Sequence, residues 1–336
     1  MKKIYFYAGH HVDFKWVFST LKACRDLGLN VCYGCVYGIE DVQQSPYFLK
    51  NIPFFYGKEA LRVKADIVIS ASSGLSKASF RYGDFFSIHM PHSLISLHMA
   101  YPEDAFDDVD LLFAAGPHHG NEWDMINEKR FLKKKPWFAV GYGFFDLLQH
   151  ALCVRAPKRI LIAPSWGEDN LLESSALSLA QQLLSEGYDV ILRPHPLFFV
   201  DKKDVLEHLQ KICPTLTIES SLDQKNDGFY TSSFLITDYS GIAFEYAFFH
   251  HRKVIFVDTP MKKAHDNWKR DPILPIELSF RNLLGQSCPN NSHDIMQTLK
   301  HIEKMPFLTQ DMTKNFVYHP FLCKMYASSI LNSLVL

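Results

Sequence analysis

The sequence predicts an α/β protein made of two consecutive halves, each a parallel sheet wound with helices. Short apolar runs alternate with stretches in which apolar residues recur at helical spacing, and this alternation is typical of doubly wound folds. The length of 336 residues corresponds to about two domains. A charged joint around Lys158 and Arg159 separates the halves, and the alternation restarts after it.

The first half, residues 1–153, is expected to form an N-terminal domain. Residues 14–27 show helical spacing and precede Gly28, a residue type that often ends helices because it tolerates left-handed backbone. The short apolar runs are interpreted as buried strands. These runs cover residues 3–7, 30–37, 66–70, 85–88, 111–115 and 137–140.

The second half, residues 158–310, is expected to form a C-terminal domain of the same kind. Apolar residues recur at helical spacing before Gly187 and lie between two strands, so residues 160–192 form one β-α-β unit. The recurring residues are Leu172, Ala176, Leu179 and Leu183. Another helix is expected over residues 204–212, and strands over 160–163, 190–192, 216–219, 234–237 and 254–257.

The sequence therefore indicates two Rossmann-like domains facing a cleft. Ligands of such sheets bind beyond the carboxyl ends of the strands, so the loops that follow the strands are the candidate sites. Residues 311–336 are expected to form a helical segment packed back on the N-terminal domain, because an exposed apolar stripe of this length is uncommon. The residues expected to face that domain are Leu322, Met325, Tyr326, Ile330 and Leu331.

Composition excludes several classes of function. Hydrophobic residues make up 47% and charged residues 21%, as in globular rather than disordered proteins. Lys and Arg number 35 against 36 Asp and Glu, so the net charge of -1 gives no electrostatic basis for binding nucleic acid. No run is apolar enough to predict a transmembrane helix, and the N-terminal apolar run is too short for a signal peptide. We therefore expect a cytoplasmic protein.

Cysteines and histidines do not predict a metal site or a cofactor. Cys32 and Cys35 form a CxxC pair, but no second pair completes a zinc site and the pair lies in an expected strand. We interpret the seven cysteines as reduced thiols, with a redox pair as the alternative. The 16 histidines show no HExxH spacing. His92 differs from the others because it follows the strand over 85–88, where a neutral imidazole could act as a general base.

Two loops of the second half carry polar residues directly after strands. Ser165 lies in the segment Ala-Pro-Ser-Trp-Gly after the strand over 160–163. Arg193 and His195 follow the next strand, and the prolines on both sides of His195 restrict its backbone. A guanidinium and an imidazole at this place suit phosphate oxygens. The alternative is an Arg paired with a local carboxylate and a His that caps a loop.

A third loop gives a stronger signal. The strand over 234–237 ends in Thr237 and Asp238, passes through Ser240 and Gly241, and leads into a helix. Helix N-termini present N–H groups and a positive dipole end, which together bind phosphate. Glu245 lies one turn into that helix, where a carboxylate could accept ribose hydroxyls. The alternative is an ordinary capped helix in which Asp238 satisfies backbone N–H groups.

Taken together, these loops resemble the CDP-glycerol glycerophosphotransferase family of teichoic-acid and capsule synthesis. The matching segments run in the family's order between about residues 85 and 260. They are Ala163-Pro164-Ser165-Trp166, Arg193 with His195-Pro196, Thr237-Asp238-Tyr239-Ser240-Gly241 with Glu245, Gly141-Tyr142-Gly143-Phe144-Phe145-Asp146, and His92-Ser93-Leu94. Gly143 and Phe144 replace a family Pro-Arg, and Ser93-Leu94 replaces Gly-Thr after the base histidine. Both departures lie on the acceptor side, so the donor side keeps the pattern better.

The resemblance implies a GT-B type fold and a phosphotransferase that moves glycerol phosphate or ribitol phosphate from a CDP-alcohol donor. His92 would be the general base, and His195 would act with it as a catalytic residue. Arg193, Thr237, Asp238, Ser240, Gly241, Glu245 and Ser165 would bind the donor's phosphates and nucleotide, with no metal and no cofactor. The acceptor would be a hydroxyl of a cell-surface glycan or a lipid-linked acceptor, and CMP would be released.

Two other classes remain open from the sequence. One is a GT-B glycosyltransferase that uses a nucleotide sugar in surface polysaccharide synthesis. The other is a non-enzymatic protein that binds nucleotides or glycans. Residues 129–137 alternate basic and aromatic side chains, which could contact an anionic bilayer at the inner face of the cytoplasmic membrane. A solvated charged loop is the alternative for that segment.

Overall fold

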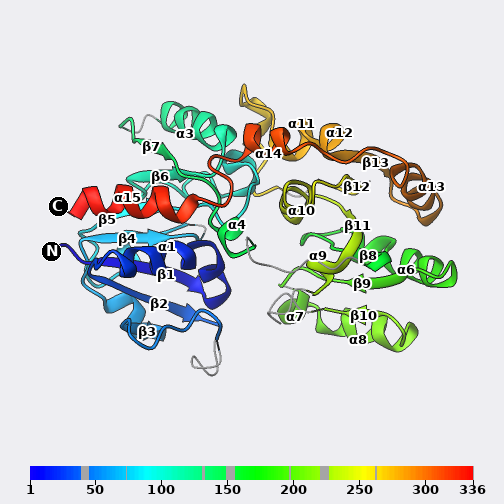
Figure 1. Ribbon diagram of the computed structural model, residues 1–336, viewed down its shortest axis with the longest axis horizontal. Coiled ribbons are helices and arrows are strands. Elements are labelled where there is room, and N and C mark those ends of the chain that lie inside the picture. The colour runs from blue at the N-terminus through cyan, green and yellow to red at the C-terminus, as the bar shows by residue number, and fades with distance from the viewer. Residues whose placement is uncertain are drawn as a thin grey trace. The chain divides into compact units, whose positions relative to one another are not determined.

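Two compact units make up the chain. The computed structural model describes residues 1–38, 45–72, 74–130, 133–148, 156–196, 198–219, 227–261 and 263–335. Unit 1 comprises residues 1–150, 264–273 and 313–336, and unit 2 comprises residues 151–263 and 274–312 (Figure 1). Residues 264–273 therefore group with unit 1, although they lie between two segments of unit 2 in the sequence.

Unit 1 contains a seven-stranded parallel sheet in the order β3-β2-β1-β4-β5-β6-β7. The strands are β1 (Ile4–His10), β2 (Val31–Tyr37), β3 (Phe54–Tyr56), β4 (Ile67–Ser70), β5 (Phe86–His89), β6 (Leu111–Ala114) and β7 (Trp137–Ala139). The helices of unit 1 are α1 (Phe14–Asp26), α2 (Leu97–Ala100), α3 (Pro117–Lys129), α4 (Gly143–Leu148) and α15 (Cys323–Val335). Helix α14 (Gln310–Phe316) spans the boundary, with residues 310–312 in unit 2 and 313–316 in unit 1. Short 3-10 helices are η1 (His11–Asp13), η3 (Gly57–Arg62), η4 (Lys77–Ser79) and η5 (Asn267–Arg270).

Unit 2 contains a six-stranded parallel sheet in the order β10-β9-β8-β11-β12-β13. Its strands are β8 (Ala156–Ile162), β9 (Asp189–Leu192), β10 (Thr217–Ile218), β11 (Ser232–Thr237), β12 (Val254–Asp258) and β13 (Gly285–Pro289). Its helices are α5 (Leu171–Ser174), α6 (Ala176–Ser185), α7 (Phe198–Asp201), α8 (Lys203–Ile212), α9 (Asp227–Thr231), α10 (Ile242–His250), α11 (Ile276–Ser279), α12 (Arg281–Leu284) and α13 (Ser292–Ile302).

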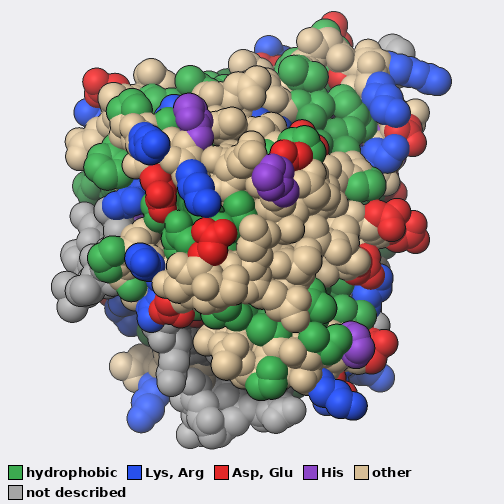
Figure 2. Space-filling view, turned by 90° about the vertical axis from the view of Figure 1, so that its right-hand side faces the viewer, with side chains coloured by type: hydrophobic (Ala, Val, Ile, Leu, Met, Phe, Trp, Pro, Cys, Tyr) green, Lys and Arg blue, Asp and Glu red, His purple; other side chains and the backbone are tan. Residues whose placement is uncertain are grey.

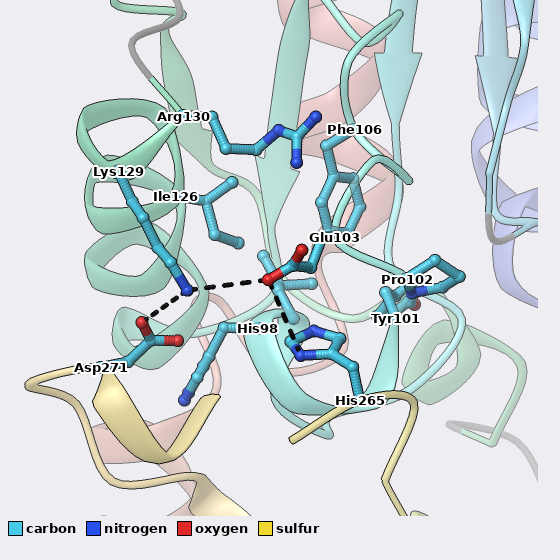
Figure 3. Close-up of a pocket in the computed structure, with 11 residues that line it drawn as sticks. His98, Tyr101, Pro102, Glu103, Phe106, Ile126, Lys129, Arg130, His265 and Asp271 are labelled. Atoms are coloured by element: carbon cyan, nitrogen blue, oxygen red, sulfur yellow. Dashed lines mark hydrogen bonds and ion pairs between the residues drawn. The ribbon is translucent and has the colours of Figure 1, made fainter. Parts of the chain in front are cut away.

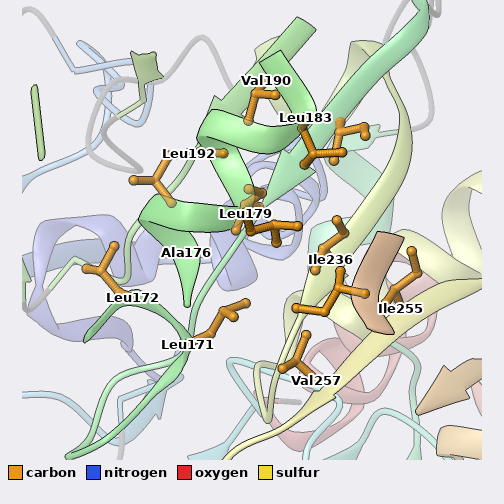
Figure 4. Close-up of a cluster of buried hydrophobic side chains, with 14 of the residues drawn as sticks. Leu171, Leu172, Ala176, Leu179, Leu183, Val190, Leu192, Ile236, Ile255 and Val257 are labelled. Carbon is orange, nitrogen blue, oxygen red and sulfur yellow. The ribbon is translucent and has the colours of Figure 1, made fainter. Parts of the chain in front are cut away.

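The core of unit 2 shows why the apolar spacing of its sequence predicts this fold. Leu179 and Leu183 of α6 are fully buried against the sheet, where Ile236 of β11 and Ile255 of β12 are also fully buried (Figure 4). Burial of such side chains contributes about 1.5–3 kcal/mol each. The helical spacing of one segment and the continuous apolar runs of the others therefore meet in one cluster. The predicted α/β class, with two parallel sheets, is confirmed.

Two strands were not predicted, and both lie at sheet edges. β3 has three partly exposed residues, and β13 is interrupted by polar Gln286 and Ser287. β13 therefore lacks the continuous apolar run that marks a buried parallel strand, and the apolar run of β3, Phe54-Phe55-Tyr56, is only three residues long. Their pairing with β2 and β12 supplies the structure that their own sequences do not indicate.

Helix α15 packs against α1 in unit 1, but its buried face differs from the expected one. Leu331 is buried as expected, whereas the exposed fractions of Leu322, Met325 and Tyr326 are 40%, 58% and 40%. Ile330 is partly buried. The buried residues of α15 are Cys323, Ala327, Ser328, Leu331 and Val335, and the first three of them are small. Small residues let two helices approach closely, so the bulky side chains lie on the other side of α15.

None of the helices in the described ranges is long and apolar enough to span a bilayer. On the face shown in Figure 2, Lys and Arg side chains lie among Asp and Glu side chains. This mixing agrees with the net charge of -1 of the whole chain.

Candidate functional site

The strand order of unit 2 reverses between β8 and β11. The chain winds outward from β8 to β10 on one side and from β11 to β13 on the other. In doubly wound sheets, ligands bind in the crevice outside the strand ends at such a reversal. The loop with Ser165 follows β8, and the loop with Asp238 and Ser240 follows β11. Two of the three predicted loops of this half thus flank the reversal.

Asp238 joins these two loops through its carboxylate. It is 1% exposed. One carboxylate oxygen accepts hydrogen bonds from the N–H of Ser165 at 2.7 Å and of Tyr239 at 2.8 Å, and the other accepts from the N–H of Leu171 at 3.1 Å. Thr237 donates its hydroxyl hydrogen to the carbonyl of Ala163 at 2.6 Å. Both side chains therefore hold the loops in place, as in the structural alternative considered for Asp238.

Ser240 and Gly241 lead directly into α10. Gly241 is the N-cap residue with helical backbone angles, φ −60° and ψ −22°. The carbonyls of Ser240 and Gly241 accept the first helical hydrogen bonds from Ala243 and Phe244, both at 3.1 Å. Both residues are partly exposed, so the N-terminal end of α10 is accessible to a ligand. The dipole of a nine-residue helix favours an anion at this end.

Arg193 is held in an ion pair at the end of β9. Its Nε lies 3.1 Å from Oε2 of Glu219, and Arg193 is 8% exposed. Burial lowers the pKa of Arg193, and the carboxylates of Glu219 and Glu245 oppose that shift. Glu245 lies in the first turn of α10 and is also buried, so Arg193 and Glu245 share one electrostatic environment. The pairing of Arg193 with a local carboxylate matches the structural alternative for this residue.

His195 lies beside the loop after β8. The ring centroids of His195 and Trp166 are 6.4 Å apart, and His195 is partly exposed. The carbonyl of His195 accepts a hydrogen bond from the N–H of Phe198 at 3.0 Å, which fixes the start of α7. The structure therefore brings the loops after β8 and β9 together.

Arg281 is a residue of this region that the sequence analysis missed. It is 7% exposed, and its guanidinium lies 2.8 Å from Oδ1 of Asp258. It lies over the ring of Tyr239, 4.5 Å from the centroid, and donates to the carbonyl of Asp238 at 3.5 Å. It also donates to the hydroxyl of Ser287 at 3.1 Å. A lone Arg in the sequence of α12 carries no signal for this role, because its partners come from distant strands.

In unit 1, His92 follows the end of β5 and is in contact with aromatic side chains. Its Nδ1 is 3.2 Å from the carbonyl oxygen of Ala71 and 2.8 Å from the hydroxyl of Tyr101. The rings of Trp16 and Tyr101 meet it edge to face, each with a centroid distance of 5.3 Å. Ala71 follows β4 and Trp16 lies in α1 after β1, so His92 lies near the reversal of strand order in the unit 1 sheet.

Tyr142 connects His92 to the segment that resembles the family's Gly-Tyr-Pro-Arg. Its hydroxyl donates to the carbonyl of His92 at 3.1 Å and accepts from the indole N–H of Trp16 at 2.8 Å. A Cβ at Gly143 would collide with the carbonyl oxygen of Trp16, so this glycine lets α4 approach α1. The departure from the family's proline at this position therefore has a packing reason.

The CxxC pair does not have the properties of a reactive thiol. Burial raises the pKa of Cys32 to about 11 and of Cys35 to about 12, whereas redox-active cysteines have lowered pKa values. Cys24, Cys213, Cys288 and Cys323 are also free and buried, and Cys153 lies outside the described residues. Within the described ranges, no three His, Cys, Asp or Glu side chains are placed to hold a metal ion.

Comparison with known protein families gives a match that lies mainly in the second half of the chain. Residues 145–272 match the family CDP-Glycerol:Poly(glycerophosphate) glycerophosphotransferase. The predicted family resemblance is confirmed. Residues 145–272, the segment that matches this family of transferases, contain Ser165, Arg193, His195 and the whole loop from Thr237 to Glu245. A sequence search of curated proteins gave no match.

Solved structures match over the whole chain and show the fold. The S. aureus MnaA-UDP structure has 14% sequence identity and a TM-score of 0.68, covering 99% of this chain and 96% of MnaA. The wall teichoic acid polymerase TagF with CDPG has 14% identity and a TM-score of 0.63, covering 99% of this chain and 87% of that chain. The Neisseria meningitidis UDP-GlcNAc 2-epimerase bound to UDP-GlcNAc has 10% identity and a TM-score of 0.66, covering 99% of both chains. The segment that matches the family model thus lies in a fold of the GT-B type, as predicted.

Proposed function

We propose that this protein transfers glycerol phosphate or ribitol phosphate from a CDP-alcohol to a hydroxyl of a glycan or lipid-linked acceptor. The observation that carries this proposal is the family match over residues 145–272, because it contains the loops at the reversal of strand order in unit 2. The resemblance of the fold to TagF with CDPG supports the same donor class. Unit 2 would bind the donor, and unit 1 would provide the acceptor side.

The donor's diphosphate would lie at the N-terminal end of α10. Ser240 and Gly241 would donate backbone N–H groups to it, and Arg193 and His195 would stabilise its charge. Glu245, buried in the first turn, would accept ribose hydroxyls. Ser165, Thr237 and Asp238 would fix the shape of the site, because their hydrogen bonds tie the loops after β8 and β11 to each other and within themselves.

His92 would be the general base. We assign the ring hydrogen to Nδ1, which then donates to the carbonyl oxygen of Ala71 at 3.2 Å, while the hydroxyl of Tyr101, 2.8 Å from the same nitrogen, accepts from it. The Nε2 is then unprotonated and can take the proton of the acceptor hydroxyl. The acceptor oxygen forms a bond to the β-phosphorus, the phosphoanhydride bond breaks, and CMP leaves with that electron pair.

The experiment is release of CMP from CDP-glycerol and CDP-ribitol, measured for the protein and for His92→Ala and His195→Ala. We expect both substitutions to lower turnover by a factor of about 100 or more. The exposed His208 on α8 provides the matched control, and His208→Ala should keep wild-type turnover. Wild-type rates in both site variants would overturn these assignments.

A nucleotide-sugar glycosyltransferase is the second candidate, because two of the structurally similar proteins were solved with UDP or UDP-GlcNAc bound. Assays with UDP- and GDP-sugars, scored for UDP or GDP release, distinguish it from the first. A cytoplasmic location at the inner face of the membrane is part of the proposal, supported by the basic and aromatic run over 129–137, of which residues 131 and 132 lie outside the described residues. Sedimentation with anionic liposomes tests it, and binding unchanged after neutralising Lys133, Lys134 and Lys135 would remove this run from the proposal.

A further inference from the structure

Unit 1 contains a pocket of about 370 Å³ to which the proposed function assigns no role. Its walls come from α2, the loop that follows it, α3 and the segment 264–273 (Figure 3). The volume falls in the range of small-molecule sites, about 300–1,000 Å³. All of its lining residues belong to unit 1, so the pocket is a property of that unit alone.

The cationic side chains of the pocket are already paired with carboxylates, Lys129 within the lining and Arg130 with Asp107 just outside it. Nζ of Lys129 lies 3.0 Å from Asp271 and 4.0 Å from Glu103, and Arg130 holds Asp107 through two contacts at 2.8 and 2.5 Å. Figure 3 shows Glu103, Lys129 and Asp271 directed at each other. The two cations of the lining are thus balanced by nearby carboxylates, and a phosphate would add negative charge beside Glu103 and Asp271. The pocket therefore favours an uncharged ligand over an anion.

Neutral hydroxyl groups fit the same lining. Oε1 of Glu103 accepts from the side chain of Asn267 at 2.7 Å and lies 4.0 Å from Nδ1 of His265. Carboxylates can accept from hydroxyls while ammonium and imidazole groups donate to them. Phe106 and Ile126 add an apolar wall. Polar groups around an apolar wall suit a sugar or polyol, which has both hydroxyl groups and C–H surfaces.

Tyr101 places this pocket beside the proposed base. Tyr101 is one of the residues that line the pocket, and its hydroxyl lies 2.8 Å from Nδ1 of His92. The segment 264–273 closes the other side through backbone contacts to α2: the N–H of Ala264 donates to the carbonyl of Met99 at 2.9 Å, and His98 Nε2 lies 3.1 Å from the carbonyl oxygen of Ile273. A ligand here would be one side chain away from His92.

We propose that this pocket binds an uncharged saccharide or polyol unit of the acceptor, and not a phosphate-bearing unit. This inference rests on the proposed function, because it assigns the class of acceptor to that reaction. It implies that the transferred polyol phosphate is attached to a neutral sugar rather than added to a chain that ends in polyol phosphate.

The test is saturation-transfer NMR without donor, so that binding is measured apart from turnover. The probes are glucose, galactose, N-acetylglucosamine and N-acetylmannosamine on one side, and glycerol 3-phosphate on the other. We expect at least one neutral sugar to bind and to keep binding in His92→Ala. Binding of glycerol 3-phosphate alone, or of none of the five probes, would overturn the proposal. The separate CMP-release assay shows whether the proposed function fails instead.

Two pocket variants locate the binding. Glu103→Gln and His265→Ala should each raise the Kd of the bound sugar about tenfold, as expected for loss of a hydrogen bond to a charged or imidazole group. Glu128→Gln is the control, since Glu128 is exposed on α3, the helix that contributes Ile126 and Lys129 to the pocket, but does not itself line it. Thermal unfolding of each variant shows that it is folded. Equal sugar affinity in the pocket variants and the control would place the binding elsewhere and overturn the proposal.

Discussion

The carboxylate of Asp238 accepts a hydrogen bond from the backbone N–H of Ser165 at 2.7 Å, and so ties the loop after β11 to the loop after β8. These residues are 73 positions apart in the chain. The same carboxylate accepts from two more backbone N–H groups. One buried side chain thus sets the geometry of the region where the family motifs meet.

Asp238→Ala should destabilise unit 2 by about 3 kcal/mol or more, because it leaves three buried N–H groups without their acceptor. Asp238→Asn keeps an acceptor oxygen and should cost less. Urea unfolding at pH 7 measures both. A change below about 0.5 kcal/mol in Asp238→Ala would show that the loops hold their shape without this carboxylate.

Arg281→Lys should raise the KM for CDP-glycerol more than it lowers kcat. A lysine keeps the charge near Asp258, but its single nitrogen cannot reach the separate acceptors that the three guanidinium nitrogens contact, and it cannot lie flat over Tyr239, so the loop after β11 loses a support. Steady-state kinetics with varied donor measure the effect. Arg270→Lys, at an exposed position of η5, is the control. Unchanged donor KM in Arg281→Lys would contradict a positioning role.

Stability should fall as the pH falls below about 6.5, in part because of His89. Burial and the nearby His92 and His119 lower the pKa of His89 to about 3, and the pKa of a histidine in the unfolded chain is about 6.5. The neutral ring is therefore favoured in the folded state, and that advantage is present above pH 6.5 and lost between 6.5 and 3.

His89→Phe should flatten this dependence by up to about 1.4 kcal/mol per pH unit in that window. Phenylalanine can keep the edge-to-face contacts with Tyr101 and Phe106. Unfolding free energies at pH 7.5, 6 and 5 give the slope. The exposed His208→Ala should leave the slope unchanged, and an unchanged slope in His89→Phe would contradict the prediction.

Asp146 should have the opposite effect on the pH dependence. Burial raises its pKa to about 6, against a usual value of 3.8, although its carboxylate accepts from the N–H of Lys324 at the start of α15 at 2.6 Å. The folded state then binds a proton that the unfolded chain does not, so this group's contribution falls as the pH rises from about 4 to 6.

Asp146→Asn removes this ionisation and keeps an acceptor oxygen for Lys324. Relative to wild type, it should gain about 2–3 kcal/mol of stability between pH 4 and pH 7. Chemical unfolding at the two pH values gives that difference. Equal differences between variant and wild type at both pH values would show that Asp146 ionises with an ordinary pKa.

Local patterns in the sequence are sufficient to predict the α/β class and the positions of the loops. Buried parallel strands need continuous apolar runs, and helices on a sheet need apolar residues at helical spacing, so both are visible over a few residues in segments such as 160–192. The order of these elements then places Ser165, Arg193 and Ser240 after strands. The family motifs could be found in the same way, because each is a short contiguous segment.

Only the tertiary structure decides which of these residues form ion pairs, hydrogen bonds or a common pocket with one another. Glu219 pairs with Arg193, Arg281 supports the loop of Asp238, and residues 264–273 join unit 1 to form a pocket wall. These relationships depend on which distant segments pack together, and a hydrogen bond or an ion pair leaves no periodic trace in either segment. The face that α15 buries was decided in the same way, because the fit of Cys323 and Ala327 against α1 outweighed the exposure of larger apolar side chains.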